Sequence, residues 1–151
     1  KIPGMYNVKD LGYNFRMTDF QAVLLFTQLK RYSLNLKKKI NNAKIYEYYL
    51  KNCKNISFSK FSKNNSYFIF QIFVNKIKRN SLIQKMVKNN IGCSIHYATP
   101  LPYFDYYKKF NNRKFKNAES YANCNISLPV HPELKKNEIK FITNFLEENT
   151  R

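Results

Sequence analysis

The chain has 151 residues, with 27 Lys and Arg against 9 Asp and Glu, and a formal net charge of +18. A hydrophobic fraction of 44% with 17% aromatic residues is enough for a core, which excludes a disordered basic tail and indicates one globular domain. The longest nearly apolar run, residues 67–74, is far shorter than the about 20 residues of a membrane-spanning helix. The composition therefore favours a globular protein with no membrane-spanning segment.

The positive charge raises nucleic acid as a partner, because such a field attracts polyanions. However, the cations are mostly lysines spread along the chain together with many Asn and Ile residues, a composition typical of A/T-rich codons. Nucleic-acid binding therefore stays a minor alternative. Cys53, Cys93 and Cys124 are odd in number and widely separated, so neither a disulfide framework nor a metal site is indicated. A reducing cytoplasm is the expected location.

Residues 1–17 contain a proline and two glycines and lack helical periodicity, so extended segments and turns are expected. The chain begins without Met, which favours a fragment or a processed chain. Thr18 and Gln21 then have the spacing of a capping box, and Asp19 complements the helix dipole. No proline or glycine follows up to Asn52, so a long helix is predicted over residues 18–52, long enough to bridge two domains.

Two strands are predicted next. Residues 56–61 alternate between apolar and polar side chains, whereas residues 67–74 are nearly continuous Phe and Ile. The first pattern indicates a half-buried strand and the second a fully buried one, with a turn at residues 64–65. Five side chains of the second strand are expected in the core: Phe68, Ile69, Phe70, Ile72 and Phe73.

A short helix with a capping box at Ser81 is predicted to end at Asn90, because Asn tolerates the left-handed conformation of a helix end. Residues 91–95 alternate as a strand that ends at His96, and residues 98–110 form a loop stiffened by two prolines.

The last third of the chain predicts a short helix over residues 117–124, a brief strand over 126–128 and a turn at His131. A closing helix then presents an apolar stripe made of Ile139, Ile142, Phe145 and Leu146. The elements together predict an α+β fold, in which helices pack a small antiparallel or mixed sheet and a long helix precedes it.

Self-contained catalytic signatures are absent: there is no nucleophile elbow, P-loop, dinucleotide fingerprint or zinc-protease motif. The informative stretch is residues 12–22. A glycine turn before a capped helix explains Gly12 and Thr18, but it does not explain Asn14 and Arg16. An amide and a guanidinium just ahead of a helix N-terminus suit the capture of a phosphate or carboxylate.

This stretch resembles the DegT-type family of nucleotide-sugar aminotransferases, which depend on pyridoxal 5′-phosphate (PLP) and carry a similar G-Y-N-x-R-M-S/T-D-x-Q-A motif. Residues 90–97 resemble the family's G-I-x-x-x-x-H-Y segment with Asn90 in place of glycine, and Pro100 and Leu101 match the residues after it. Residues 117–119 and 127–134 resemble its N-A-E and S-L-P-x-x-P-x-L elements. The resemblance covers almost the entire chain, in the same order.

The resemblance implies the C-terminal portion of a fold-type I aminotransferase. Residues 1–17 would be the extended segment with the Gly-Tyr-Asn-x-Arg motif, residues 18–52 the interdomain helix and residues 53–151 the small α+β domain. The large domain, which carries the Schiff-base lysine in the family, is absent from this chain. We therefore expect no lysine of this chain to be catalytic and no activity from this part alone.

For function, the resemblance implies transfer of an amino group from an amino acid, with glutamate as the expected donor, to a nucleotide-linked keto-sugar for amino-sugar or polysaccharide biosynthesis. Asn14 would bind the PLP phosphate of the other subunit of a homodimer. Tyr13 and Arg16 would lie on the substrate side of the same site, and His96 and Tyr97 would contact the amino-acid or sugar substrate. Family members often carry a second histidine where this chain has Pro102, which bears on sugar specificity.

Other interpretations remain open at this stage. One is that the chain is a non-catalytic remnant that binds a partner protein. Another is that it is a basic nucleic-acid-binding module. If these residues have only structural roles, His96 is a structural histidine, Tyr97 a core residue and His131 a turn residue. Cys93 and Cys124 are expected to be small buried residues.

Overall fold

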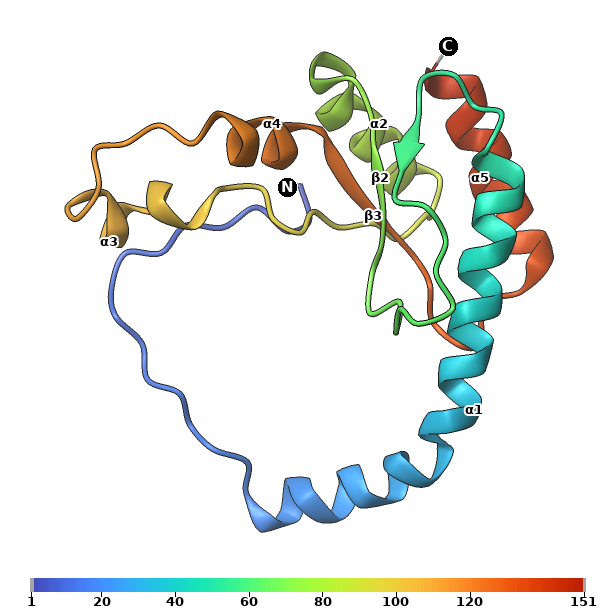
Figure 1. Ribbon diagram of the computed structural model, residues 1–151, viewed down its shortest axis with the longest axis horizontal. Helices are drawn as coiled ribbons and strands as arrows, with labels where there is room; N and C mark the ends of the chain where they lie inside the picture. Colours follow the sequence, from blue (N-terminus) through green and yellow to red (C-terminus); the bar gives the residue numbers. More distant parts are fainter. Residues whose placement is uncertain (1, 151) are drawn as a thin grey trace.

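The computed structural model describes residues 2–150, apart from the side chain of Lys76. It has an α+β fold in which helices pack against a three-stranded antiparallel sheet, and this confirms the predicted fold class (Figure 1). The elements in chain order are α1 (Asp19–Leu50), β1 (Ser57–Phe58), β2 (Phe70–Phe73), α2 (Lys76–Lys88), η1 (Leu101–Tyr103), α3 (Asp105–Lys108), α4 (Lys116–Cys124), β3 (Asn125–Leu128) and α5 (Lys136–Thr150).

The sheet has the order β1-β2-β3, with Phe70 opposite Leu128 and Phe73 opposite Asn125. Two of the predicted strands differ from the structure. β1 keeps only two of residues 56–61, and the strand predicted over residues 91–95 is wrong, because this segment contributes only a single bridge between Ser94 and Ser127. Edge strands have one neighbour only and are often very short, which alternation in the sequence does not reveal.

The predicted capping box begins α1 as expected. Gln21 N–H donates to the Thr18 hydroxyl at 3.4 Å, and Thr18 N–H donates to the Gln21 side chain at 2.9 Å. The helix runs for 32 residues, close to the predicted range. Its buried residues, however, all lie at the C-terminal end, from Asn42 onward.

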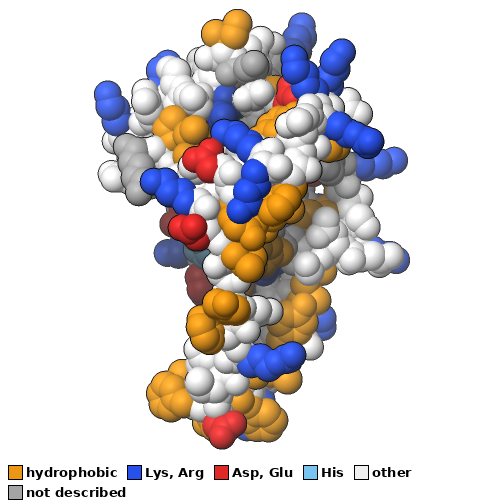
Figure 2. Space-filling model, turned by 90° about the vertical axis from the view of Figure 1, so that its left-hand side faces the viewer, with side chains coloured by type: hydrophobic (Ala, Val, Ile, Leu, Met, Phe, Trp, Pro, Cys, Tyr) orange, Lys and Arg blue, Asp and Glu red, His pale blue; other side chains and the backbone are white. Residues whose placement is uncertain are grey.

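The first half of α1 projects from the domain (Figure 1). This half carries many large apolar side chains, and the described residues do not bury them. Figure 2 shows hydrophobic side chains gathered on this protruding part. The exposed large side chains of this half are Phe20, Val23, Leu24, Leu25, Phe26, Leu29, Tyr32 and Leu34. None of the helices within residues 2–150 is both long enough and apolar enough to cross a lipid bilayer.

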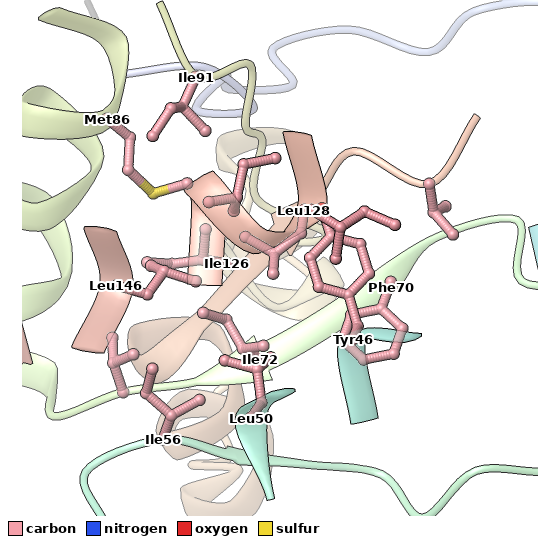
Figure 3. Close-up of a cluster of buried hydrophobic side chains, with 14 of the residues drawn as sticks. Tyr46, Leu50, Ile56, Phe70, Ile72, Met86, Ile91, Ile126, Leu128 and Leu146 are labelled. Atoms are coloured by element: carbon pink, nitrogen blue, oxygen red, sulfur yellow. The ribbon is translucent and has the colours of Figure 1, made fainter. Parts of the chain in front are cut away.

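The core lies between one face of the sheet and the helices α1, α2 and α5 (Figure 3). Burial alternates along β2, where Phe70 and Ile72 are buried. The expectation that all five side chains of this run are core is therefore wrong: Phe68 is 77% exposed, and Ile69 and Phe73 are half-buried. Ile69 and Phe73 alternate with the buried Phe70 and Ile72, and only one face of the sheet meets the core. Phe68 lies in a bend before β2, next to Tyr67, which has a positive φ of 46° and is buried in its place. The largest fully buried side chains are Tyr46, Leu50, Ile72, Leu82, Ile83, Met86, Ile95, Ile126, Ile139 and Leu146.

α2 begins earlier than predicted. The Asn75 side chain accepts the Ile77 N–H at 2.9 Å and caps the helix, so Ser81 lies inside it and the capping box expected there is wrong. Asn is among the strongest N-cap residues, and here it follows β2 almost directly. The predicted end is confirmed, because Asn90 has φ of 57°, the left-handed conformation.

The predicted loop over residues 98–110 contains two short helical segments, η1 and α3. Pro102 lies within η1, where a proline in the first turn is tolerated because its missing N–H needs no partner there. The predicted short helix, brief strand and closing helix correspond to α4, β3 and α5. His131 is exposed and its carbonyl accepts the Leu134 N–H at 3.2 Å, which confirms it as a turn residue.

Candidate functional site

The face of the sheet opposite the core carries polar side chains. Gln71 and Ser127 are register partners on β2 and β3, one residue away from the core pair Ile72 and Ile126. Because successive side chains of a strand point to opposite faces, Gln71, Ser127 and Asn125 share the non-core face.

His96 lies against this polar face, two residues after the bridge at Ser94. Its backbone N–H donates to Asn125 Oδ1 at 3.1 Å, and its carbonyl accepts from Gln71 Nε2 at 2.5 Å. Its ring Nδ1 is 2.8 Å from the Ser127 hydroxyl. The ring is half-buried, and its Nε2 has no hydrogen-bond partner among residues 2–150. His96 therefore combines a fixed position with a free ring nitrogen.

A cavity of about 790 Å³ opens beside His96. Its walls are mostly apolar and include four aromatic side chains. Tyr97 at its edge is 58% exposed, so the interpretation of Tyr97 as a core residue is wrong. A large cavity with apolar walls and a few convergent polar groups is typical of small-molecule sites. The main lining side chains are Tyr6, Gln71, His96, Tyr97, Phe104 and Tyr121. A second cavity of about 880 Å³ also reaches His96, but contains no other predicted site residue.

The N-terminal segment forms one wall of the first cavity. The ring of Tyr6 stacks on Phe104 with centroids 5.3 Å apart, and the Tyr106 N–H donates to the Val8 carbonyl at 2.9 Å. Gly4 has φ of 81° and lies against the Ile95 backbone, where an added Cβ would be 2.6 Å from two backbone atoms. A glycine is therefore required for this close approach.

Two further contacts fix the rim. Asn7 donates to the Asp105 carboxylate, and Lys108 and then Asn7 hold the pKa of Asp105 below its ordinary value by binding the ionised form. The Tyr103 hydroxyl donates to Glu119 at 2.5 Å, which ties η1 to α4. This hydrogen bond to Glu119 raises the pKa of Tyr103, because it favours the protonated hydroxyl.

The other predicted site residues lie in the segment that leads into α1. Tyr13 is 83% exposed, and Asn14 and Arg16 are also exposed, without a hydrogen-bond partner among the described residues. After Val8 this segment leaves the side of α3 and runs to the start of α1, away from the sheet (Figure 1). Within residues 2–150, no hydrogen bond, ion pair or ring contact connects it to His96 or Tyr97. The structure thus pairs His96 with Tyr97 and leaves the other three apart.

The cysteines lie outside this site. None of the three forms a disulfide within the described residues, and all are half-buried, so the expectation of burial for Cys93 and Cys124 is wrong. Burial nevertheless raises the pKa of the Cys93 thiol to about 11, which keeps it protonated at neutral pH.

Sequence reasoning missed the residues that hold His96, namely Gln71, Asn125 and Ser127. One signal was available, because Asn125 and Ser127 alternate with Ile126 and Leu128. That alternation indicates a strand with one polar face. The contact of Gln71 with His96 spans 25 residues and has no counterpart in local sequence.

Comparison with known proteins gives consistent matches. A sequence model of the DegT/DnrJ/EryC1/StrS aminotransferase family matches residues 3–147. A UDP-4-amino-4,6-dideoxy-N-acetyl-beta-L-altrosamine transaminase from Campylobacter jejuni is 30% identical over 145 residues, which are 91% of this chain and 38% of that protein.

Two solved structures show the same fold. Helicobacter pylori PseC, an aminotransferase involved in pseudaminic acid biosynthesis, is 24% identical with a TM-score of 0.80, over 95% of this chain and 40% of that one. DesV from S. venezuelae is 21% identical with a TM-score of 0.82, over 93% and 38%. The chain therefore spans about two fifths of the length of these proteins.

Proposed function

Because the chain belongs to the DegT/DnrJ/EryC1/StrS aminotransferase family, we propose that it is the C-terminal part of a sugar aminotransferase. The enzyme transfers an amino group from an amino acid, with glutamate as the donor, to a nucleotide-linked keto-sugar in amino-sugar or surface-polysaccharide biosynthesis. The match over residues 3–147 carries this proposal. The transaminase activity in the name of the C. jejuni relative supports it.

The aminotransferases of this family depend on PLP, which supplies the electron sink for moving an amino group between substrates. The residues present fit part of such a site. Asn14 and Arg16 are exposed donors close to the N-terminus of α1, without a hydrogen-bond partner in the described part of the chain, as a phosphate requires. None of the described residues that line the cavity beside His96 is a lysine. We therefore assign the lysine that would form the Schiff base with PLP to a large domain outside this chain, in the same full-length protein.

The separation of the two residue groups fits a site shared between the subunits of a homodimer, and we propose that this homodimer is cytoplasmic. Asn14 in one subunit would donate to the PLP phosphate bound by the other subunit, with Tyr13 and Arg16 on the substrate side. The cavity beside His96 would form the other part of the site. There, His96 Nε2 and the Tyr97 hydroxyl would form hydrogen bonds with the substrate. These two side chains position the substrate, and proton transfer belongs mainly to the lysine.

The assignment of Asn14 is tested with Asn14→Ala in the full-length protein. Loss of a hydrogen bond to a charged phosphate typically costs about 1.5–3 kcal/mol, so PLP retention during dialysis should fall by about tenfold or more. Absorbance of bound PLP in the visible range measures this. Asn112→Ala is the matched control, since Asn112 is an exposed loop residue without a side-chain hydrogen bond among the described residues. Equal PLP retention in the two variants would contradict the assignment.

A second function, a stand-alone remnant that binds a protein partner, is favoured by one observation, the exposed apolar half of α1. A visible absorption spectrum of the protein purified from its source cells distinguishes this remnant from the aminotransferase. A PLP band bleached by glutamate supports the transaminase, whereas a colourless 151-residue protein supports the remnant. The minor nucleic-acid alternative predicts binding that falls steeply with salt.

A further inference from the structure

The backbone of the His96–Tyr97 pair is held by hydrogen bonds from side chains of β2 and β3, and not by backbone hydrogen bonds of the sheet. Asn125, the first residue of β3, is fully buried. Its Oδ1 accepts the His96 N–H at 3.1 Å, and its Nδ2 donates to the carbonyls of Tyr121 at 2.9 Å and of Tyr97 at 3.4 Å. One buried amide therefore joins the end of α4 to the backbone of both site residues.

Gln71 holds the same pair from β2. Its Nε2 donates to the His96 carbonyl at 2.5 Å, and its Oε1 accepts the Tyr121 hydroxyl proton at 2.5 Å. Tyr121 is itself fixed, because its ring packs edge-on against Phe73 with centroids 5.0 Å apart. The backbone N–H and C=O of His96 are thus both bonded to side-chain amides that are anchored to α4.

The ring of His96 is held separately by Ser127, which is 4% exposed. Its hydroxyl lies 2.8 Å from Nδ1 and has no other side-chain partner among the described residues. A serine hydroxyl can donate to a ring nitrogen or accept from it, so this contact holds the ring in place in either tautomer. Ser127 thus fixes the direction in which the ring presents Nε2 to a ligand.

We infer that Asn125, Gln71 and Ser127 are positioning residues: the two amides fix the backbone of the His96–Tyr97 pair, and Ser127 fixes the His96 ring. The inference rests on the proposed function of the cavity, because it assigns these residues a role in presenting His96 to substrate. A buried amide with every hydrogen bond satisfied is rigid as well as costly to disturb, so the pair is organised before substrate arrives.

The test uses the full-length protein with ¹⁵N-labelled histidine, with resonances of His96 identified from a His96→Gln variant. Ser127→Ala should change the Nδ1 ¹⁵N shift of His96, because that nitrogen loses its hydrogen-bond partner. Ser94→Ala is the matched control, because Ser94 faces Ser127 across the bridge and has no side-chain hydrogen bond among the described residues. Ring shifts that stay the same in Ser127→Ala would overturn the role of Ser127.

The amide of His96 reports on the backbone clamp. Asn125→Ala removes the acceptor of the His96 N–H and should speed the hydrogen exchange of that amide by about tenfold or more. Asn123→Ala, on α4, is the control for loss of a nearby amide. Unchanged exchange in Asn125→Ala would overturn the clamp. If that variant does not fold, the same measurement on Gln71→Ala, which removes the donor to the His96 carbonyl, takes its place.

These spectra need neither PLP nor substrate, so their outcome is independent of the Asn14 experiment. Changed spectra with unaltered PLP retention in Asn14→Ala would leave the positioning network standing and count against the proposed function. The reverse result would remove the network and keep the proposed function.

Discussion

The two halves of α1 have the same kind of sequence but opposite surroundings. From Asn42 to Leu50 the helix buries Ala43, Tyr46 and Leu50 completely against the sheet and α5. From Phe20 to Leu34 side chains of similar size and polarity are exposed, with Phe20 at 74% and Leu29 at 64%. An apolar stripe in a helix therefore shows that a partner is needed, but not that the partner lies in the same domain.

The comparison also explains the shape of the molecule. The packed half positions the sheet and its cavity, whereas the projecting half and the segment before it carry Asn14 and Arg16 away from the sheet (Figure 1). We expect a large domain of the full-length protein to cover the projecting half, and this would bring the two groups of site residues into one enzyme. Three predictions test the difference between the halves.

The largest expected effect is on global stability. Leu50→Ala creates a cavity in the core and should lower the free energy of unfolding by about 2–5 kcal/mol. Leu29→Ala changes an exposed side chain and should alter it by less than about 0.5 kcal/mol in the 151-residue chain. Urea unfolding of both variants measures the contrast.

The same pair in the full-length protein sharpens the comparison. If a further domain covers Leu29, the cost of Leu29→Ala rises toward the range for buried leucines. A cost that remains below about 0.5 kcal/mol in both proteins would show that this half stays exposed.

A smaller effect concerns Tyr46, whose ring stacks on Phe70 with centroids 4.9 Å apart and whose buried hydroxyl has no hydrogen-bond partner among the described residues. Burial, with a lesser contribution from Glu138, raises its pKa well above the ordinary value of 10.0. In the unfolded chain Tyr46 ionises at the ordinary pKa. The contribution of neutral, buried Tyr46 to the free energy of unfolding is therefore complete below pH 10 and is lost as the pH rises further.

Tyr46→Phe keeps the ring and removes the titration. At neutral pH it should be nearly neutral or slightly stabilising, because a buried unsatisfied hydroxyl is removed. Above pH 10 the wild type should lose up to about 1.4 kcal/mol per pH unit relative to the variant. Parallel stability curves for the two proteins between pH 7 and 11 would contradict the burial of a neutral Tyr46.

The sequence was informative where a local signal decides the structure and silent where a distant contact does. Thr18 and Gln21 define the start of α1, and Asn90 defines the end of α2 through its own conformation. Phe68 was misplaced because it lies in a bend before β2, where Tyr67 with φ of 46° is the buried residue, and hydrophobicity alone does not show this.

The candidate site divides in the same way. His96 and Tyr97 were found through family motifs, whereas the bonds of Gln71 to His96 and to Tyr121 span 25 and 50 residues. Such contacts depend on strand register and on the placement of α4, and neither can be read from the residues around Gln71.

The smallest expected effect tests the projecting half itself. Thr18→Ala removes the side-chain acceptor for the Gln21 N–H, and loss of such a cap costs about 1 kcal/mol. Because the first turns of α1 have no packing partner among residues 2–150, this loss should fray them locally and leave the core intact. Hydrogen exchange of amides near Gln21 should then accelerate about fivefold, while those near Tyr46 stay protected. Faster exchange near both Gln21 and Tyr46 would mean that the two halves of α1 unfold as one unit. The halves would then differ in solvent exposure alone and not in local stability.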